Sequence, residues 1–164
     1  MAAIGTLDFE PDGDKLFYIF HISVTGQLQY SVVDMNASGG AVGNSPPLGA
    51  VTTLNQTIGN ASGAIAVVKS AQSPSYLLSF EGGFLISRRI EPAEGDFTET
   101  DTQSLPFTPK AIIFDEERGQ LILIPEDPNE DLMIVDYDTA TGTFGSATVI
   151  PGSGGQDGIE GAAF

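Results

Sequence analysis

Short apolar runs alternate with clusters of turn-forming residues along the whole chain. The runs are rich in β-branched and aromatic side chains, and examples lie at 16–20, 64–68, 121–124 and 132–135. Gly, Pro, Asn, Asp and Ser separate the runs, which is the pattern of many short strands joined by turns. Because 20 glycines and 10 prolines interrupt the chain too often for a long helix, the sequence predicts an all-β fold.

Residues 64–97 repeat at 111–144 with a constant offset of 47 residues and no insertion or deletion. Self-similarity of this period is typical of repeat architectures, and a repeat of four antiparallel strands is a β-propeller blade. The third repeat predicts its strands most clearly, at 111–114, 121–124, 132–137 and 144–150. In the first repeat Phe9 and Leu16 are seven residues apart, as are Phe114 and Leu121 in the third. An irregular β-sandwich is the alternative, but it does not require a fixed register.

The predicted fold is therefore an all-β β-propeller segment of three four-stranded antiparallel blades plus one extra inner strand. The blades are expected at about 4–58, 59–107 and 108–152. The extra strand is expected at 158–164, because Ile159–Phe164 aligns with Pro109–Phe114. Since propellers close with roughly four to eight blades, the expected partners are other blades of the same parent protein or a second copy of the chain.

The composition excludes some classes of partner. The chain has 22 acidic and 6 basic residues and a net charge of −16, which repels nucleic acid and anionic membranes. No apolar run approaches the roughly 20 residues that a membrane helix needs, so neither nucleic-acid binding nor membrane insertion is expected. The acidity fits solubility, a secreted or high-salt setting, or cation binding. The chain contains no cysteine, so it has no disulfide and no thiolate ligand or nucleophile.

Three glycosylation sequons begin at Asn36, Asn55 and Asn60. They favour an extracellular or secreted protein, with a soluble cytoplasmic one as the alternative. No basic region followed by an apolar core is present at the N-terminus, which predicts no signal peptide.

The repeats resemble the seven-bladed lactonase family, which includes 6-phosphogluconolactonase-like and carboxymuconate-cyclase-like proteins. The segments that carry the resemblance are FEPDGDKLFYIFHISVTGQLQYSVVD, SRRIEPAEGDFTETDTQSLPFTPKAIIF and MIVDYDTATGTFGSATV. The last contains Asp138-Thr-Ala-Thr-Gly142, which is similar to the family's D-P-A-T-G turn. The resemblance implies a seven-bladed ring, of which this chain supplies about three blades.

The resemblance also implies a site at one mouth of the central channel, built from His, Arg and Glu where first strands begin and second strands end. Lys110 and Glu160 precede the first strand in successive repeats, and His21 and Glu126 occupy equivalent ends of second strands by residue count. These four residues are the catalytic candidates. The family's usual histidine is replaced by Lys110 and Glu160, and its Asn-Glu ending reads Phe20-His21 here. His21 is the only histidine, and a structural role for it is the alternative.

A candidate metal site lies between the second and third strands of the third repeat. Asp127, Asn129 and Asp131 alternate there, and hard oxygen ligands suit Ca²⁺. The glycine turn and distal Glu of an EF-hand are absent, so a solvated turn without any cofactor is the alternative. Arg88 and Arg89 form the only pair of adjacent basic residues, and on a strand they face opposite sides, with pairing to a carboxylate of a neighbouring blade expected for one of them.

Three functions remain open from the sequence. The preferred one is a non-catalytic binding or scaffold module with a small-molecule or glycan ligand. The second is a lactonase or cycloisomerase, in which a carboxylate or histidine does acid–base work and a lysine stabilises oxyanion charge. The third is a structural component of a surface or virion assembly.

Overall fold

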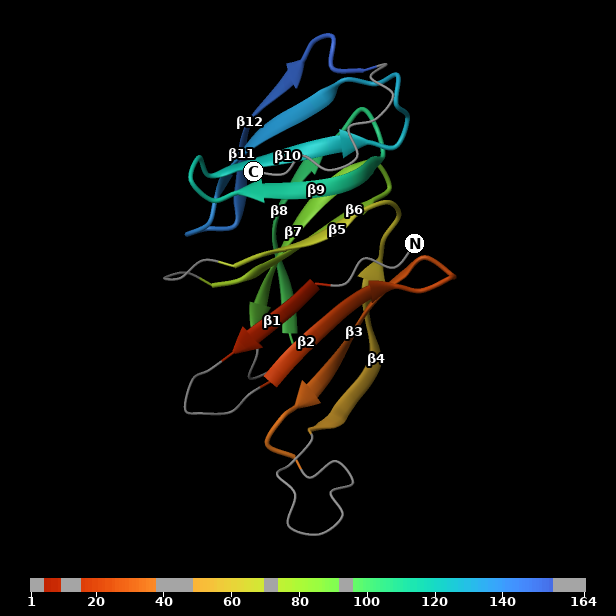
Figure 1. Cartoon of the computed structure of the whole chain (residues 1–164), viewed down its shortest axis with the longest axis vertical. Coiled ribbons are helices and arrows are strands. Elements are labelled where there is room, and N and C mark those ends of the chain that lie inside the picture. The colour runs from red at the N-terminus through yellow and green to blue at the C-terminus, as the bar shows by residue number, and fades with distance from the viewer. Residues whose placement is uncertain (1–4, 10–15, 38–48, 70–73, 92–95, 155–164) are drawn as a thin grey trace.

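A computed structural model gives the fold, and it describes residues 5–9, 16–37, 49–69, 74–91 and 96–154. Within these ranges the chain forms strands and turns and no helix. The strands build three four-stranded antiparallel sheets, which we call blades 1, 2 and 3 (Figure 1). The predicted all-β fold of three four-stranded antiparallel blades is thus confirmed. The extra strand expected at 158–164 lies outside the described residues.

Each blade is a meander in which consecutive strands pair. Blade 1 contains β1 (Gly5–Phe9), β2 (Leu16–Ile22), β3 (Gln27–Asp34) and β4 (Ala50–Asn60). Blade 2 contains β5 (Ile65–Val68), β6 (Tyr76–Glu81), β7 (Phe84–Glu91) and β8 (Asp96–Ser104). Blade 3 contains β9 (Pro109–Asp115), β10 (Gln120–Pro125), β11 (Leu132–Asp138) and β12 (Thr143–Ile150).

The first strands of the three blades are neighbours in space. β5 contacts both β1 and β9, so the first strands form the inner row of the stack (Figure 1). The fourth strands lie at the other end of each sheet, and β8 contacts β12 there. This arrangement gives each blade one inner edge, one outer edge and two faces.

Alternating side chains divide the core into two layers, one at each junction between blades. Because successive side chains of a strand point to opposite faces, β6 sends Leu77 towards blade 1 and Leu78 towards blade 3. The layer between blades 1 and 2 is centred on Tyr18 and Phe20, and the other layer includes Leu121. Blade 2 is therefore covered on both faces.

The constant 47-residue offset between blades 2 and 3 holds for their first, third and fourth strands but not for their second strands, β6 and β10. Ile65 and Ile112 occupy the same place in β5 and β9, and Ile86 and Met133 in β7 and β11, both 47 residues apart. In the second strands, Ile65 pairs with Ser79 of β6, and Ile112 pairs with Leu123 of β10. Leu123 is only 44 residues after Ser79. The expectation of a repeat without insertion or deletion is thus wrong, since a longer β5–β6 connection is offset by a shorter β6–β7 turn.

In blade 1, the alternation of side chains between the two faces of the sheet is shifted by one residue relative to blade 3. The expected equivalence of the first hairpins is confirmed as far as pairing goes, because Phe9 pairs with Leu16 and Phe114 with Leu121. However, Leu16 packs towards the following blade, and Leu121 packs towards the preceding one. A shift of one residue exchanges the faces of a strand, so residues matched by counting from these leucines point to opposite sides of their blades.

The two adjacent arginines face opposite sides of blade 2, as expected. Arg88 is 7% exposed, donates to Ser79 Oγ at 2.6 Å and lies 3.7 Å from Glu81 Oε2. Arg89 is exposed and pairs with Glu91 at 2.6 Å. Both carboxylates belong to blade 2 itself, so the expected pairing with a neighbouring blade is wrong. Blade 1 contributes Asn60, whose amide donates to Glu81.

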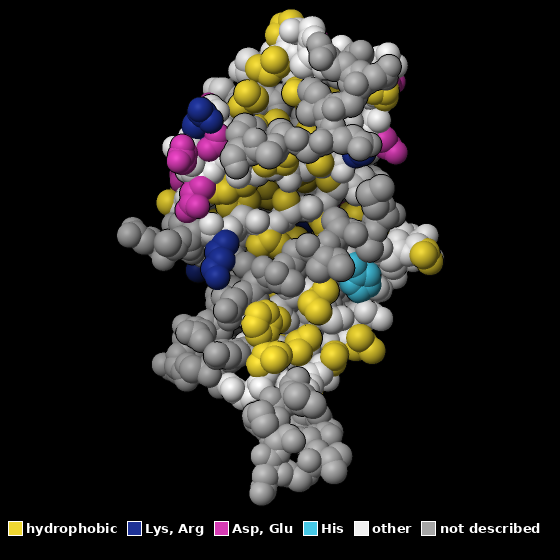
Figure 2. All heavy atoms as spheres, viewed as in Figure 1, with side chains coloured by type: hydrophobic (Ala, Val, Ile, Leu, Met, Phe, Trp, Pro, Cys, Tyr) yellow, Lys and Arg dark blue, Asp and Glu magenta, His cyan; other side chains and the backbone are white. Residues whose placement is uncertain are grey.

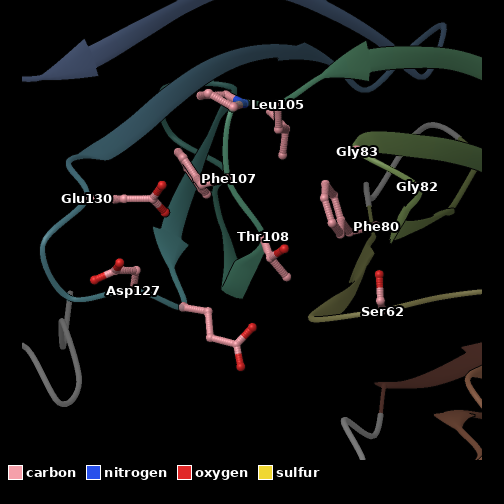
Figure 3. A pocket seen from close by; sticks show the side chains of 11 residues that line it. Ser62, Phe80, Gly82, Gly83, Leu105, Phe107, Thr108, Asp127 and Glu130 are labelled. Carbon is pink, nitrogen blue, oxygen red and sulfur yellow. The ribbon is translucent and has the colours of Figure 1, made fainter.

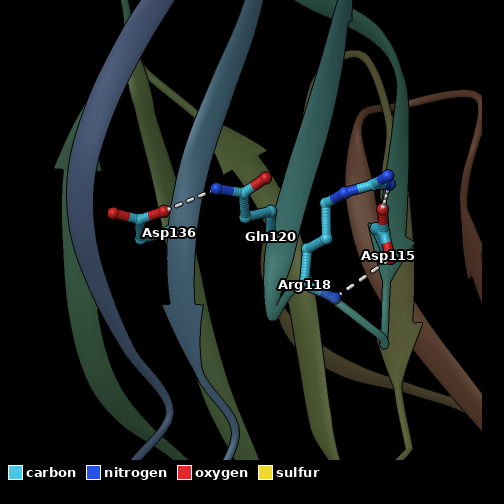
Figure 4. Close-up of polar contacts among 4 residues, drawn as sticks. All are labelled: Asp115, Arg118, Gln120 and Asp136. Carbon is cyan, nitrogen blue, oxygen red and sulfur yellow. Dashed lines mark hydrogen bonds and ion pairs between the residues drawn. The ribbon is translucent and has the colours of Figure 1, made fainter.

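Side chains fix the hairpin turns of blade 3. Asp115 accepts hydrogen bonds from the backbone N–H and the guanidinium of Arg118, and Gln120 donates to Asp136 across β10 and β11 (Figure 4). The side-chain hydrogen bond from Arg118 holds the pKa of Asp115 below its ordinary value. The Asp115 carboxylate is therefore charged at neutral pH, and its two hydrogen bonds with Arg118 hold the β9–β10 turn.

Candidate functional site

Two hollows open at the same end of the blades, where second strands end and first strands begin. The larger is a groove of about 690 Å³ between blades 2 and 3, and we call it the interblade groove. The smaller has about 380 Å³ and is lined by residues from all three blades; we call it the inner hollow. Both lie at the end of the blades at which a site is expected, and a third hollow of about 330 Å³ lies at the opposite end of blade 3, at the β9–β10 and β11–β12 turns.

Four connections form the interblade groove. They are the β4–β5 connection with Ser62, the β6–β7 turn with Gly82 and Gly83, the segment 105–108 before β9, and the β10–β11 loop (Figure 3). Backbone hydrogen bonds hold these segments, from Ser62 N–H to the carbonyl of Phe80 at 2.7 Å and from Leu105 N–H to the carbonyl of Gly83 at 2.9 Å. The walls are therefore continuous with the two sheets.

The groove combines an apolar wall with an acidic rim. Phe80, Leu105 and Phe107 are buried members of the core between blades 2 and 3, and they form the wall. Asp127 and Glu130 lie on the β10–β11 loop on one side of the opening, opposite Ser62 and Phe80 (Figure 3). Because a fixed wall meets several carboxylates, this opening suits a polar or cationic group on a partly apolar ligand.

The inner hollow brings two of the predicted site residues together. Lys110 at the start of β9 and Glu126 at the end of β10 both line it and are both exposed. The N–H of Glu126 donates to the carbonyl of Thr108 at 2.8 Å, which fixes the backbone at the end of β10 against the start of β9. Glu126 lines the interblade groove as well, so the two hollows meet at this carboxylate.

His21 lies on another face of blade 1. Ile22, not His21, lines the inner hollow beside Lys110 and Glu126. Ile22 packs with the core towards blade 2, and His21 pairs with Gln29 on the opposite face of the sheet. The expected equivalence of His21 and Glu126 is therefore wrong by one residue. The cause is the one-residue shift of side-chain alternation in blade 1, which places His21 on the opposite face of its sheet. Glu160 lies outside the described residues.

Gly63 is a residue of the hollow that sequence reasoning missed. It has a φ of +85°, and a β-carbon there would lie 2.6 Å from the carbonyl oxygen of Pro109. Gly63 is 47 residues before Lys110, so the repeat offset itself offered the signal: the same position is glycine in one blade and lysine in the next. The blade with glycine leaves room for the backbone of its neighbour.

The predicted calcium ligands belong to two separate networks. Asp127 Oδ1 accepts hydrogen bonds from the backbone N–H and the side-chain amide of Asn129, at 2.9 and 2.8 Å. The first of these bonds is the main reason why the pKa of Asp127 lies below its ordinary value. Asp131 instead accepts from the N–H of Gly154 at 2.9 Å and ties the end of blade 3 to the loop.

Among the described residues no cluster of three acidic or histidine side chains is arranged to hold a metal ion. The structure thus brings Asp127 and Asn129 together and directs Asp131 elsewhere, and the calcium site stays a prediction.

The sequence matches no protein-family model and no curated protein. The part of the chain that the structure describes contains no helix able to cross a membrane.

Proposed function

We propose that the chain is a non-catalytic binding and scaffold module that supplies three blades to a larger propeller. The observation that carries the proposal is an apolar row on the face of blade 3 that is turned away from blade 2. Further blades of the same kind are the proposed occupants of this face.

The row consists of isoleucines in register across three strands. Ile113 pairs with Ile122, and Ile122 pairs with Ile134. Their neighbours in the strands, such as Leu121 and Leu123, point into the core between blades 2 and 3 and are fully buried. All three isoleucines are only half-buried. A sheet with one solvated face usually alternates apolar and polar residues, whereas β10 is apolar on both faces.

The outer face of blade 1 has the same character. Phe17 pairs with Val33, and Val33 pairs with Val51, which is 56% exposed. Hydrophobic side chains reach the surface over both end blades (Figure 2). The apolar positions therefore continue beyond the two junctions that the chain forms itself.

The junctions inside the chain support another blade as the occupant. At each junction a sheet face rich in aliphatic and aromatic residues meets a second such face, and no layer of another kind intervenes. The outer face of blade 3 points in the same direction along the stack as the face of blade 2 that blade 3 covers. A fourth blade would therefore repeat an interface that the chain already makes.

The interblade groove is the proposed ligand position of this module. Its acidic rim and apolar wall suit a small polar ligand or a glycan that carries hydroxyl or cationic groups. The groove lies between two blades that are locked by a shared core, so binding there requires little reorganisation.

Thiol labelling tests the scaffold proposal, because the chain has no cysteine of its own. Ile122→Cys should react readily in this chain and become protected in the product of the complete gene that encodes it. Thr102→Cys, an exposed residue on the outer strand of blade 2, is the matched control and should react equally in both. Equal labelling of Ile122→Cys in both proteins would contradict a covering blade.

A lactonase or cycloisomerase is the second candidate, favoured by the shared position of Lys110 and Glu126 at the inner hollow. Glu126 would act as the acid–base group, and Lys110 would stabilise oxyanion charge. Lactone hydrolysis by the unmodified protein, lost in both Glu126→Gln and Lys110→Met, is the expected result. Activity unchanged in both variants would remove this candidate.

A further inference from the structure

The three glycosylation sequons occupy different positions in the fold. The sequon of Asn36 ends at Ser38, which lies outside the described residues. Asn55 lies in the middle of β4, the last strand of blade 1, and Asn60 is the final residue of the same strand (Figure 1). A glycosylated asparagine must hold a bulky group in the folded protein, so its amide nitrogen needs access to solvent. The surroundings of Asn55 and Asn60 therefore decide which of the two can carry a glycan.

Asn55 lies in a bulge of β4. The pairing between β3 and β4 shifts at Ser31, so that two residues, Leu54 and Asn55, lie opposite this one serine. Asn55 has a φ of +50°, a left-handed conformation that asparagine adopts more readily than most residues. The side chains of residues 54–57 are all exposed. The bulge thus takes Asn55 out of the regular ladder and leaves it on the surface.

The fold holds Asn55 through its backbone and its amide oxygen. Ser31 Oγ accepts a hydrogen bond from the Asn55 N–H at 3.1 Å and donates one to Asn55 Oδ1 at 3.4 Å. The Nδ2 atom makes no hydrogen bond to another residue that the structure describes. N-glycosylation substitutes Nδ2 and leaves Oδ1 as an acceptor. A glycan on Asn55 would therefore keep both hydrogen bonds to Ser31.

The amide of Asn60 belongs to the junction between blades 1 and 2. Its Nδ2 atom donates to Oε1 of Glu81 in blade 2 at 3.4 Å, and Oε2 of the same carboxylate lies 3.7 Å from Arg88. The next residue, Ala61, is only 4% exposed and packs in the core between these two blades. A glycan on Asn60 would therefore stand directly at the contact between two blades.

We propose that Asn55, rather than Asn60, is the N-glycosylation acceptor of β4. In the reaction Nδ2 of Asn55 attacks C1 of the first sugar of an oligosaccharide linked to a lipid diphosphate. The N–C1 bond forms and the bond from C1 to the diphosphate oxygen breaks, so the lipid diphosphate leaves with the electron pair, and a base of the transferase takes one proton from Nδ2. The proposal rests on the secreted setting that the sequons favour and is independent of the interblade groove.

A glycan at Asn55 would shield the outer edge of blade 1. β4 carries no charged side chain between Ala50 and Asn60, and Val51 and Leu54 within it are 56% and 63% exposed. An exposed edge strand with apolar side chains invites the addition of another strand, and proteins cover or interrupt such edges. A bulky hydrated group in the middle of β4 would cover the strand on both sides of the bulge.

Glycopeptide mapping tests the assignment. The chain is secreted from cultured mammalian cells behind a cleavable signal peptide, and peptide N-glycosidase converts each modified asparagine to aspartate for mass spectrometry. Most molecules should be modified at Asn55 and few at Asn60. Thr57→Ala destroys the Asn55 sequon and should remove the glycan, whereas Gln56→Ala keeps the sequon and is the matched control. An unmodified Asn55, or an occupancy of Asn60 that equals or exceeds that of Asn55, would overturn the proposal.

A second measurement separates the fold from the preference of the transferase. The chain contains no cysteine, so Asn55→Cys and Asn60→Cys can each be labelled in purified protein with a polyethylene glycol maleimide, a bulky hydrated group like a glycan. Each labelled variant is compared with its own unlabelled form by urea unfolding. The label should leave the midpoint of Asn55→Cys unchanged and lower that of Asn60→Cys. Equal shifts at the two positions, zero included, or a larger loss at position 55 would also overturn the proposal.

Discussion

Gly142 at the β11–β12 turn of blade 3 lies directly against the ring of Tyr76 in β6 of blade 2. A β-carbon at position 142 would overlap the ring and lie 2.6 Å from its Cδ1 atom. The backbone of Gly142 has a φ of +73°, and the hydroxyl of Tyr76 donates to the carbonyl of Ala140 in the same turn. The turn is thus both a hairpin connection and a contact between blades.

Gly142→Ala should destabilise the chain for two reasons. The positive φ costs an alanine about 1–2 kcal/mol, and the overlap with Tyr76 adds about 1–3 kcal/mol of overpacking. Gly152→Ala is the matched control, because Gly152 has a φ of +77° but open space around the β-carbon. Urea unfolding should give a clearly larger loss for Gly142→Ala, and equal losses would contradict the packing argument.

A buried pair of hydroxyls links the same two blades. Ser87 and Tyr137 are 2.8 Å apart between their oxygens, and Thr100 also donates to Ser87. Ser87→Ala leaves the Tyr137 hydroxyl buried without this partner, at an expected cost of about 1–3 kcal/mol. Tyr137→Phe should cost less, about 0.5–1.5 kcal/mol, because Ser87 keeps Thr100. A double-mutant cycle from urea unfolding measures the coupling, and strictly additive losses would refute it.

The positions of these contacts could be predicted from the sequence only in part. The repeat offset and the turn residues predicted the three sheets and the four strands of blade 3, because local turn chemistry and alternating apolar residues determine a hairpin. The offset and the turn residues did not predict which face of blade 1 each side chain occupies. Leu16 and Leu121 pair with equivalent phenylalanines yet face different neighbours. The face that a strand buries depends on where the next blade packs, and the pairing within a hairpin does not determine it.

The candidate site was affected by the same ambiguity. Lys110 and Glu126 lie together because they flank one hairpin, β9 and β10, whose pairing is local. The residue that blade 1 contributes to the inner hollow depends on how blades 1 and 3 are placed relative to each other. Counting residues from the start of the second strand predicts His21 at this position, but the structure has Ile22 there. Gly63 was not predicted, because the need for a glycine there arises from its contact with the backbone of Pro109 in the next blade.

Acid should remove the contribution of the Asp138 turn. Asp138 accepts hydrogen bonds from the Thr141 hydroxyl and the Ala140 N–H, both at 2.8 Å. The Thr141 bond is the main reason why its pKa lies below the ordinary value. A lowered pKa means that the folded state favours the carboxylate, so this stability is present above the ordinary pKa of aspartate and is lost as pH falls through the folded value.

Thermal unfolding of Asp138→Ala should therefore show a lower melting temperature than the unmodified chain at neutral pH, with the difference shrinking as the buffer is acidified. Glu116→Ala is the control, since Glu116 is an exposed acidic residue in the same blade. It separates the turn effect from the relief of general repulsion at a net charge of −16. A difference independent of pH would contradict the assigned role.

The polar pair at the junction of blades 1 and 2 should be replaceable by the apolar pair of blade 3. Arg88 and Ser79 occupy the places that Val135 and Leu123 fill in blade 3, and the β-carbon position of Gly59 in blade 1 is 3.6 Å from the guanidinium. Replacing both partners of a buried hydrogen bond by apolar groups can be nearly neutral or stabilising, and Glu81, which would lose its arginine, is partly exposed. The double variant Ser79→Leu with Arg88→Val should follow this rule.

Ser79→Leu alone should instead destabilise the chain, because it removes the 2.6 Å acceptor of Arg88 and leaves the buried guanidinium facing Glu81 alone at 3.7 Å. Removing one partner of a buried charge costs up to about 3–5 kcal/mol, and the partial exposure of Glu81 lowers that figure here. Urea unfolding of the two variants decides the matter. A double variant less stable than Ser79→Leu would mean that the guanidinium stabilises the junction by a contact that valine cannot replace.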